Sequence, residues 1–304
     1  MSKLSHQPVL LTETLDALNL RSDGIYIDCT YGRGGHTQAI LNRLGTDGQL
    51  LALDQDPEAV QSAQSIDDER FNIVHNPFAQ LQANIEDRSW LGQINGILLD
   101  LGVSSPQLDN PTRGFSFMQD GPLDMRMNPE DGKNVAQWLD TATAKEIAKV
   151  LRDYGEERYA NRIARAIKCE SITTTSQLAN IITKTCPPSK EHKHPATRSF
   201  QAMRIFINRE LEQLQQVLTQ TLNILAPHGR LVIISFHSLE DRIVKRFMRD
   251  NARGDNFPIH LPVTVQQLNP KLRIIGKPIR ASITETNSNP RARSAILRVA
   301  ELNS

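Results

Sequence analysis

The stretch Ile25-Tyr26-Ile27-Asp28-Cys29, followed closely by Gly32-Arg33-Gly34-Gly35, decides the fold. The first five residues predict a short buried strand, and the pattern from about His36 to Leu44, stopped by Gly45, predicts a helix after the glycine turn. Because glycine has no Cβ, the chain can turn sharply there and a ligand can lie against bare peptide. The sequence therefore predicts a strand, a ligand-binding turn and a helix in succession.

The same alternation continues along the chain. Strands are predicted over residues 50–54, 71–75, 94–101, 230–235 and 294–300, with a helical stretch opening at Pro57. Strands alternating with helices at this spacing predict an α/β fold with a doubly wound, mostly parallel sheet. The alternation of strands and helices stops at about Ser104. We therefore predict a core formed by residues 1–108 and 197–304, and an inserted α-helical substrate-recognition domain over residues 109–196.

Helices are predicted in and after the insertion. Thr143 with Glu146 forms a capping box, and residues 156–168 and 176–185 also have helical patterns. An apolar stripe from Phe200 to Leu225 predicts one long helix, ended by Pro227-His228-Gly229. Ser238 with Asp241 predicts a second capping box. It opens a helix with a basic face, formed by Arg242, Lys245, Arg246 and Arg249.

Hydropathy, cysteine spacing and charge argue against several classes of protein. No apolar run approaches the roughly 18–20 residues that span a bilayer, and no export signal opens the chain, so we expect a cytoplasmic protein and no membrane partner. Three widely spaced cysteines argue against a disulfide framework or a zinc knuckle. Residues 1–110 carry 6 Lys and Arg against 15 Asp and Glu, or −9, and the rest carries 29 against 19, or +10. This split favours a nucleic-acid partner, although unevenly charged solvated faces are the alternative.

The glycine turn and Asp54 suggest a nucleotide-like cofactor. Asp54 ends the second strand, 22 residues after Gly32, where a carboxylate can accept both hydroxyls of a ribose. This pair by itself does not separate NAD from S-adenosylmethionine. The spacing is G-x-G-G, with Thr37 at the third glycine position of a dinucleotide fingerprint, which weakens the NAD interpretation.

Longer motifs resemble one family. The motifs are Asp28–His36, Leu99–Gln107, Arg113–Phe117, Gly121–Met127, His194–Arg198 and Ser235–Arg242. With these motifs the chain resembles, over nearly its whole length, the RsmH (MraW) family of bacterial S-adenosylmethionine-dependent methyltransferases. That family usually has Gly at the position of Cys29 and often Phe at that of Tyr31. The resemblance implies a class I methyltransferase fold and methylation of N4 of a cytosine in the 16S ribosomal RNA of the small subunit.

The resemblance also implies site residues. Gly34, Gly35 and His36 would approach the methionine end of the cofactor, Asp54 would hold the ribose, Phe78 would lie by the adenine, and Asp100 and Gln107 would complete the pocket. A core position is the alternative for Phe78. No metal is implied, since His36 has no second ligand at suitable spacing. The expected partner is 16S rRNA or the small ribosomal subunit, and a homodimer is one expected assembly.

The chemistry of an exocyclic amine suggests further residues. Because Ser104-Ser105-Pro106-Gln107 follows the fourth strand, we hypothesise that Ser105, with Pro106 and a nearby carbonyl, holds N4 in line with the methyl group. A plain serine–proline turn is the alternative. Loop 113–127 could cover the base, or pack its own aromatic residues. Candidate phosphate contacts are Arg113, Arg198, Arg204, Arg242, Lys245 and Arg246.

The sequence also bears on three rival functions. A dehydrogenase would share the sheet and the acidic residue, but has no need of the basic half. An RNA-binding assembly factor with a vestigial cofactor pocket is disfavoured by the intact glycine turn, Asp54 and Asp100. A hydrolase built on Ser235, His237 and Asp241 is rejected, because these residues are too close in sequence and no G-x-S-x-G motif is present.

Overall fold

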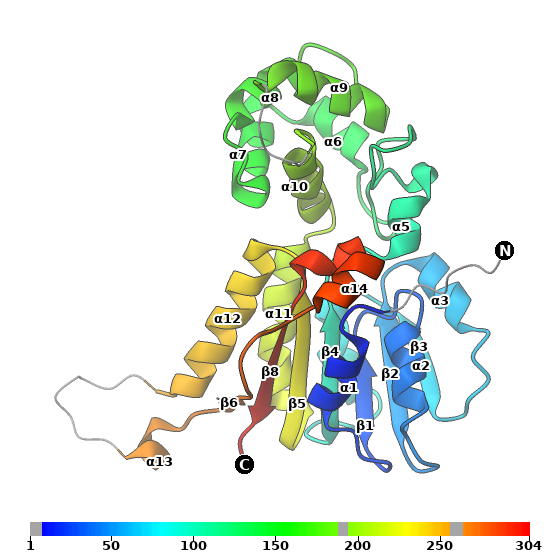
Figure 1. Ribbon diagram of the computed structural model, residues 1–304, viewed down its shortest axis with the longest axis vertical. Helices are drawn as coiled ribbons and strands as arrows, with labels where there is room; N and C mark the ends of the chain where they lie inside the picture. The colour runs from blue at the N-terminus through cyan, green and yellow to red at the C-terminus, as the bar shows by residue number, and fades with distance from the viewer. Residues whose placement is uncertain (1–7, 188–193, 256–263) are drawn as a thin grey trace. The chain divides into compact units, whose positions relative to one another are not determined.

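A computed structural model describes residues 8–187, 194–255 and 264–304 (Figure 1). The chain forms two units, Met1–Gly102 with Leu211–Ser304, and Val103–Glu210. The first unit is an α/β sheet unit and the second is helical. In the part of the chain that the structure describes, no helix combines the length and apolar character needed to cross a membrane.

The sheet unit is built on one mixed sheet of order β3-β2-β1-β4-β5-β8-β6, with β7 also paired to β8. The first five strands in this order are mutually parallel, and β8 is antiparallel to β5. The strands are β1 Ile25–Asp28, β2 Gln49–Asp54, β3 Phe71–His75, β4 Ile94–Asp100, β5 Leu225–Ser235, β6 Leu272–Ile274, β7 Ile279–Arg280 and β8 Ile296–Leu302. The predicted α/β class and its mostly parallel sheet are confirmed.

Helices cover both faces of this sheet. Alternate residues of β1, β4 and β5 point to opposite sides: Ile27, Leu99 and Ile233 join one apolar cluster with α4, α11 and α12. The neighbouring strand residues join a second cluster with α1 and α2. The helices are α1 Leu11–Leu18, α2 Gly35–Leu41, α3 Pro57–Ala63, α4 Leu81–Glu86, α11 Glu210–Ile224, α12 Ser238–Arg253, α13 Val265–Leu268 and α14 Ile283–Ser288, with 3-10 turns η1 Phe78–Gln80 and η3 Pro290–Ser294.

The helical unit has a separate core. Its cluster joins the loop residues Phe115, Met125 and Met127 to the apolar faces of the surrounding helices. Its elements are α5 Ser105–Asp109, η2 Pro111–Arg113, α6 Val135–Thr141, α7 Ala144–Gly155, α8 Ala160–Ile167, α9 Thr175–Thr185 and α10 Thr197–Ile207. The predicted capping box opens α7, where the Thr143 side chain accepts the N–H of Glu146. This unit, residues 103–210, exceeds the predicted insertion 109–196 at both ends, because α5 and α10 pack with its helices.

The predicted long helix from Phe200 to Leu225 is wrong. The chain breaks between α10 and α11, where Arg209 adopts a left-handed φ of 51°. Asn208 at the end of α10 is buried and makes side-chain hydrogen bonds to the backbone of Met125 and Met127. The apolar stripe continued through the break because both helices bury a face, each in its own unit.

Two further predictions near β5 are corrected. Pro227-His228-Gly229 lies inside β5 rather than ending a helix, and the pairing with β4 shifts between Ile94 and Gly96 to accommodate the extra residues. The capping box of α12 is formed by His237 and Glu240, not by Ser238 and Asp241. The short strands β6 and β7 and the helix α14 were not predicted.

Candidate functional site

Three carboxylates end parallel strands at one edge of the sheet. Asp28 ends β1 and pairs in register with Ala52 of β2 and Leu98 of β4. Asp54 and Asp100 stand two residues beyond those partners, so all three side chains belong to the same face of the pleated sheet. The strand order reverses between β1 and β4, and ligands of open α/β sheets bind at such a reversal, beyond the carboxyl ends.

Asp28 holds the glycine turn together. Its Oδ2 accepts the hydroxyl hydrogen of Thr37 at 2.8 Å and its Oδ1 accepts the N–H of Thr30 at 3.1 Å. The Thr30 hydroxyl in turn accepts the N–H of Asp100 at 2.7 Å. Asp28 therefore joins the turn to the first turn of α2 and, through Thr30, to β4. Sequence reasoning missed this role, although the Thr37 that replaces a third glycine was its visible signal.

Asp54 is partly buried and faces the glycine turn. Its Oδ2 accepts the N–H of Gly32 at 2.8 Å and its Oδ1 accepts the N–H of Asp56 at 2.9 Å. Burial raises the pKa of Asp54 to about 6, and the two backbone donors oppose that rise. Asp54 thus lies where the sequence predicted it, with its carboxylate directed at the turn.

His36 stands against Asp100 at the start of α2. Its Nε2 is 3.5 Å from Asp100 Oδ2, and the imidazole is 5% exposed. Burial alone would lower the pKa of His36, but the neighbouring carboxylates of Asp100 and Asp28 outweigh it and raise the pKa. Burial also raises the pKa of Asp28, against the influence of His36 and Thr37.

Some buried polar atoms at this edge have no hydrogen-bond partner among the described residues. Within the described ranges, Nδ1 of His36 and Oδ1 of Asp100 are buried without a hydrogen-bond partner, and Nε2 of His36 has only the 3.5 Å contact with Asp100 Oδ2. Buried polar atoms are normally paired, so unpaired ones call for an explanation such as a ligand. Gly34 adopts φ +73°, and a Cβ there would meet the Tyr31 ring at 2.7–2.8 Å. The edge therefore has unused polar atoms beside a turn that only glycine fits.

The remaining predicted cofactor residues belong to different units of the chain. Phe78 follows β3 in η1 and is half-buried, packed against the core cluster of the sheet unit. Gln107 belongs to the helical unit, where it is buried and its Oε1 accepts the N–H of Ser104 at 2.9 Å. Ser105 and Pro106 open α5 in that unit, and both are half-buried.

The candidate RNA-binding arginines of the helical unit differ in accessibility. Arg113 is buried, and its guanidinium donates to the carbonyls of Arg126 and Met127 at 3.2 and 2.8 Å. Arg204 pairs with Glu210 through two bonds of 2.9 Å. Arg198 is half-buried. Arg113 is therefore used inside its own loop, which packs Phe115 into the helical core, and its burial argues against the predicted phosphate contact.

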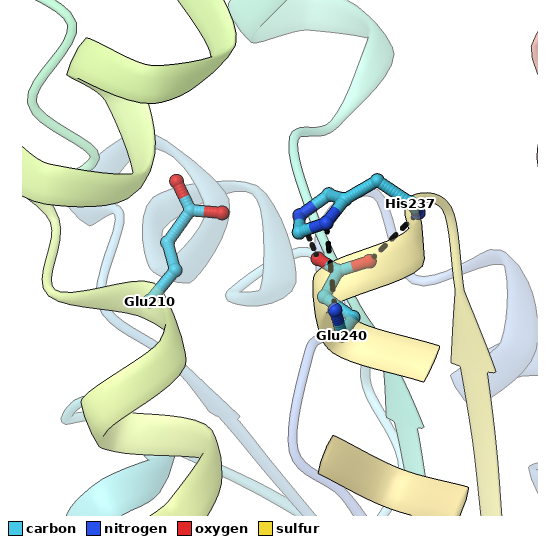
Figure 2. Close-up of side chains that lie close together, drawn as sticks. All are labelled: Glu210, His237 and Glu240. Carbon is cyan, nitrogen blue, oxygen red and sulfur yellow. Dashed lines mark hydrogen bonds and ion pairs between the residues drawn. The ribbon is translucent and has the colours of Figure 1, made fainter. Parts of the chain in front are cut away.

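The α12 candidates are exposed. Arg242, Lys245 and Arg246 all point away from the buried face formed by Val244 and Met248. Figure 2 shows His237 and Glu240 at the start of this helix: the Glu240 carboxylate accepts the N–H groups of Phe236 and His237 at 2.8 and 3.2 Å. His237 Nε2 is 3.0 Å from Glu240 Oε1. These contacts fix α12 at the carboxyl end of β5, while Glu210, also drawn in Figure 2, belongs to the helical unit.

Comparison with known proteins identifies the chain's relatives. A sequence profile described as the MraW methylase family matches residues 3–303. Among solved structures, a candidate rRNA-methylase from Clostridium thermocellum aligns with a TM-score of 0.46 at 11% identity, covering 98% of this chain and 100% of that one. An rRNA methylase from Streptococcus thermophilus gives 0.42 at 11%, covering 97% and 93%. A candidate methyltransferase from Streptococcus mutans, in complex with SAH, gives 0.43 at 11%, covering 99% of each. At these TM-scores and identities the structural alignments assign no role to any residue of this chain. The family relationship rests on the profile match over residues 3–303.

Proposed function

This chain belongs to the MraW methylase family, and we propose that it transfers a methyl group from S-adenosylmethionine to the exocyclic N4 of a cytosine in the decoding region of 16S ribosomal RNA. Its fold is that of a class I methyltransferase and its cofactor is S-adenosylmethionine. The observation that carries the proposal is the acidic edge formed by Asp28, Asp54 and Asp100 around a glycine turn.

The residues at this edge fit the cofactor. S-adenosylmethionine supplies, when bound, a methyl group activated on a positively charged sulfonium. A cationic ligand with an ammonium group suits an edge with three carboxylates, and Asp100 Oδ1 and His36 Nδ1, which are buried without a hydrogen-bond partner among the described residues, offer it hydrogen bonds. On this proposal Asp54 accepts the ribose hydroxyls, Gly34 and Gly35 admit the methionine end, and Phe78 lies by the adenine.

The amine must be held for transfer. The lone pair of cytosine N4 is conjugated into the ring, so attack requires acceptors that favour a more tetrahedral nitrogen. Ser105 and Pro106 follow Asp100 closely in the chain, and the Ser104–Gln107 bond fixes the start of α5 that carries them. We assign to the Ser105 hydroxyl, with a nearby carbonyl, the positioning of N4 in line with the methyl group.

Substrate binding needs cations outside the acidic edge. The exposed Arg242, Lys245 and Arg246 of α12, with Arg198 of the helical unit, supply phosphate contacts. Such contacts position RNA without reading its sequence. On this proposal the enzyme works in the cytoplasm on the small ribosomal subunit, and sedimentation velocity tests whether it does so as a homodimer.

The direct test is methyl transfer. The protein is incubated with labelled S-adenosylmethionine and with small subunits, naked ribosomal RNA or duplex DNA from cells that lack the activity, and the products are digested to nucleosides for mass spectrometry. Label in N4-methylcytidine from subunits or RNA is the expected result. Absence of label on every substrate, with cofactor binding intact, contradicts the proposal and favours the assembly-factor alternative.

The role of Ser105 has its own test. Ser105→Ala should lower turnover at least tenfold while the dissociation constant for S-adenosylmethionine stays unchanged, because the hydroxyl is assigned to the amine and not to the cofactor. Ser65→Ala, at an exposed position of the sheet unit, serves as the control. Full turnover in Ser105→Ala would leave the serine as a turn residue.

A further inference from the structure

The segment before the last strand returns to the edge that carries the acidic residues. Arg280 of β7 pairs in register with Ile296, the first residue of β8, and Ile296 pairs with Ser235 at the carboxyl end of β5. On the other side of β5, Ile234 pairs with Asp100. Arg280 and Asp100 therefore lie at one edge, separated by three strand spacings or about 14 Å. Figure 1 shows α14 at this end of the sheet.

This segment, residues 279–294, is called the C-terminal strap, and it is held firmly. Glu285 Oε1 accepts the N–H of Leu10 at 2.7 Å, which ties α14 to the residue before α1. Ala292, in the middle of η3, is fully buried in the core under α1 and α2. Because Ala292 points inward, its neighbours Arg291 and Arg293 are turned outward and are exposed.

The strap is basic. Arg280, Arg291 and Arg293 are all exposed, and the acidic residue of the strap, Glu285, is engaged by Leu10. Within the described ranges of the chain, Arg280 and Arg293 form no ion pair. Arg242, the fifth residue of α12, is exposed where that helix leaves the same edge after β5. We call Arg242, Arg280, Arg291 and Arg293 the basic rim.

The edge is thus divided by charge. Carboxylates end β1, β2 and β4, while exposed arginines follow β5 and flank the start of β8. A cationic cofactor is attracted to the first part and a polyanion to the second. The guanidinium group binds phosphate through two parallel hydrogen bonds, and all four rim residues are arginine.

We propose that the basic rim binds the phosphates of single-stranded RNA next to the nucleotide that is methylated. The rim lies on rigid elements, so its arginines offer fixed contacts close to the acidic edge rather than a diffuse attraction. This inference rests on the proposed function for the identity of the RNA, and not for the existence of the phosphate-binding surface.

The test compares two charge-matched double variants. Arg280→Gln with Arg293→Gln removes two rim charges from exposed side chains. Arg43→Gln with Lys271→Gln removes two exposed charges beside the opposite edge, since Arg43 follows α2 and Lys271 precedes β6, whose Leu272 pairs with the end of β8. Binding of a fluorescein-labelled single-stranded RNA with the decoding-region sequence is measured by anisotropy between about 50 and 200 mM salt.

We expect the rim variant to weaken RNA binding about tenfold at the lower salt concentration. Its salt dependence should also fall by about 1.4 in log–log slope, because each single-strand phosphate contact contributes about 0.7. The dissociation constant for S-adenosylmethionine and the melting temperature should match those of the wild type, and the opposite-edge variant should change RNA binding less than twofold. An unchanged slope in the rim variant, or an equal loss in both variants, overturns the inference. So does a rim variant that keeps RNA binding but loses binding to phosphatidylserine vesicles, which would assign the rim to an anionic membrane.

Failure of the rim and failure of the proposed function give different results. If the wild type methylates a nucleotide atom other than cytosine N4 while the rim variant still loses RNA affinity, the proposed substrate is wrong and the rim is supported. If the wild type forms N4-methylcytidine and the rim variant does so with unchanged kcat/KM and salt dependence, the rim is wrong and the proposed function stands.

Discussion

Asp28, Asp54 and Asp100 share one edge but have different surroundings. Asp28 is almost fully buried and already accepts hydrogen bonds from Thr30 and Thr37, so its role is to hold the turn. Asp54 is partly exposed and bonded to two backbone N–H groups. Asp100 keeps one buried oxygen without a partner among the described residues. Capacity for a ligand therefore lies with Asp54 and Asp100.

Cofactor affinity should depend on the protonation of Asp54. Because its pKa is raised to about 6, the carboxylate becomes protonated as pH falls through that value and would lose the charge-assisted hydrogen bonds that we propose it makes to the ribose. We expect the dissociation constant for S-adenosylmethionine, measured by calorimetry, to rise as pH falls from 7.5 to 5. This range spans the raised pKa of about 6 and stops above the ordinary pKa of about 4. Asp54→Asn should bind roughly tenfold more weakly, as expected for a bond to a charged group. A pH dependence that survives in Asp54→Asn would instead implicate His36.

The same raised pKa has an opposite consequence for the cofactor-free protein. The folded state binds the Asp54 proton more tightly than the unfolded chain, whose carboxyl has the ordinary pKa. The stability that Asp54 contributes is therefore fully present below the unfolded pKa and is lost as pH rises through about 6. Over the same pH range, the ionised Asp54 is therefore expected to favour cofactor binding and to lower the stability of the cofactor-free folded state.

Gly34 should not tolerate a side chain. At φ +73° an alanine costs roughly 1–2 kcal/mol, and its methyl group would also lie 2.7 Å from the Tyr31 hydroxyl. We expect Gly34→Ala to lower the melting temperature and to weaken S-adenosylmethionine binding at least tenfold. Gly92→Ala is the matched control, because Gly92 has φ +70° but no atom within 4 Å of the added Cβ. Equal effects of the two substitutions would show that crowding by Tyr31 is unimportant.

At the scale of the element, the start of α12 shows how a capping pattern can be assigned to the wrong pair. Ser238 and Asp241 have the spacing of a capping box, but so do His237 and Glu240 one residue earlier, and the latter pair forms it. Asp241 is instead turned toward β8, where it makes two bonds to Arg298 at 2.7 and 3.0 Å. Only the position of β8 decides between the two registers.

The Asp241–Arg298 pair should contribute measurably to stability. Both side chains are under one-fifth exposed, at 18% and 17%, so Asp241→Ala leaves a partly buried guanidinium without its partner. We expect a loss of about 1–3 kcal/mol in the free energy of unfolding of the full chain, measured in urea. Asp250→Ala is the control, because its pair with Arg249 is 61% exposed on both sides and such surface pairs contribute little. Similar losses in both variants would contradict the assignment.

At the scale of the whole chain, the charge split of the sequence corresponds to surfaces with different partners. The acidic N-terminal part supplies Asp28, Asp54 and Asp100, and the basic remainder supplies α12 and the C-terminal strap. A cofactor with positive charge and a substrate with negative charge can then bind one protein without competing for the same charges.

Neutralising the α12 face should therefore separate the two binding events. In the triple variant Arg242→Gln, Lys245→Gln and Arg246→Gln we expect weaker binding to small subunits and a salt slope smaller by about 2, since three phosphate contacts are removed. Affinity for S-adenosylmethionine should not change. Arg204→Gln is expected to behave differently and to lower stability, because Arg204 is paired with Glu210. An unchanged salt slope in the triple variant would argue against α12 as a phosphate contact.

The sequence by itself determined the alternation of strands and helices, the glycine turn and the position of Asp54, because buried strands, turns and caps are local patterns. It also placed β3 at its observed bounds and identified the Thr143–Glu146 box that opens α7. The family resemblance, confirmed over residues 3–303, added the cofactor and the class of reaction.

Only the tertiary structure decided which residues are already engaged and where the chain divides. The stripe from Phe200 to Leu225 has helical periodicity throughout, yet Arg209 interrupts it, because periodicity reports that a face is buried and not which core buries it. In the sequence Arg113 and Arg280 look alike, because both are arginines that lie between turns. One donates to carbonyls inside a loop and the other is exposed at the edge of the sheet, because strand pairing and packing, not residue type, set their surroundings.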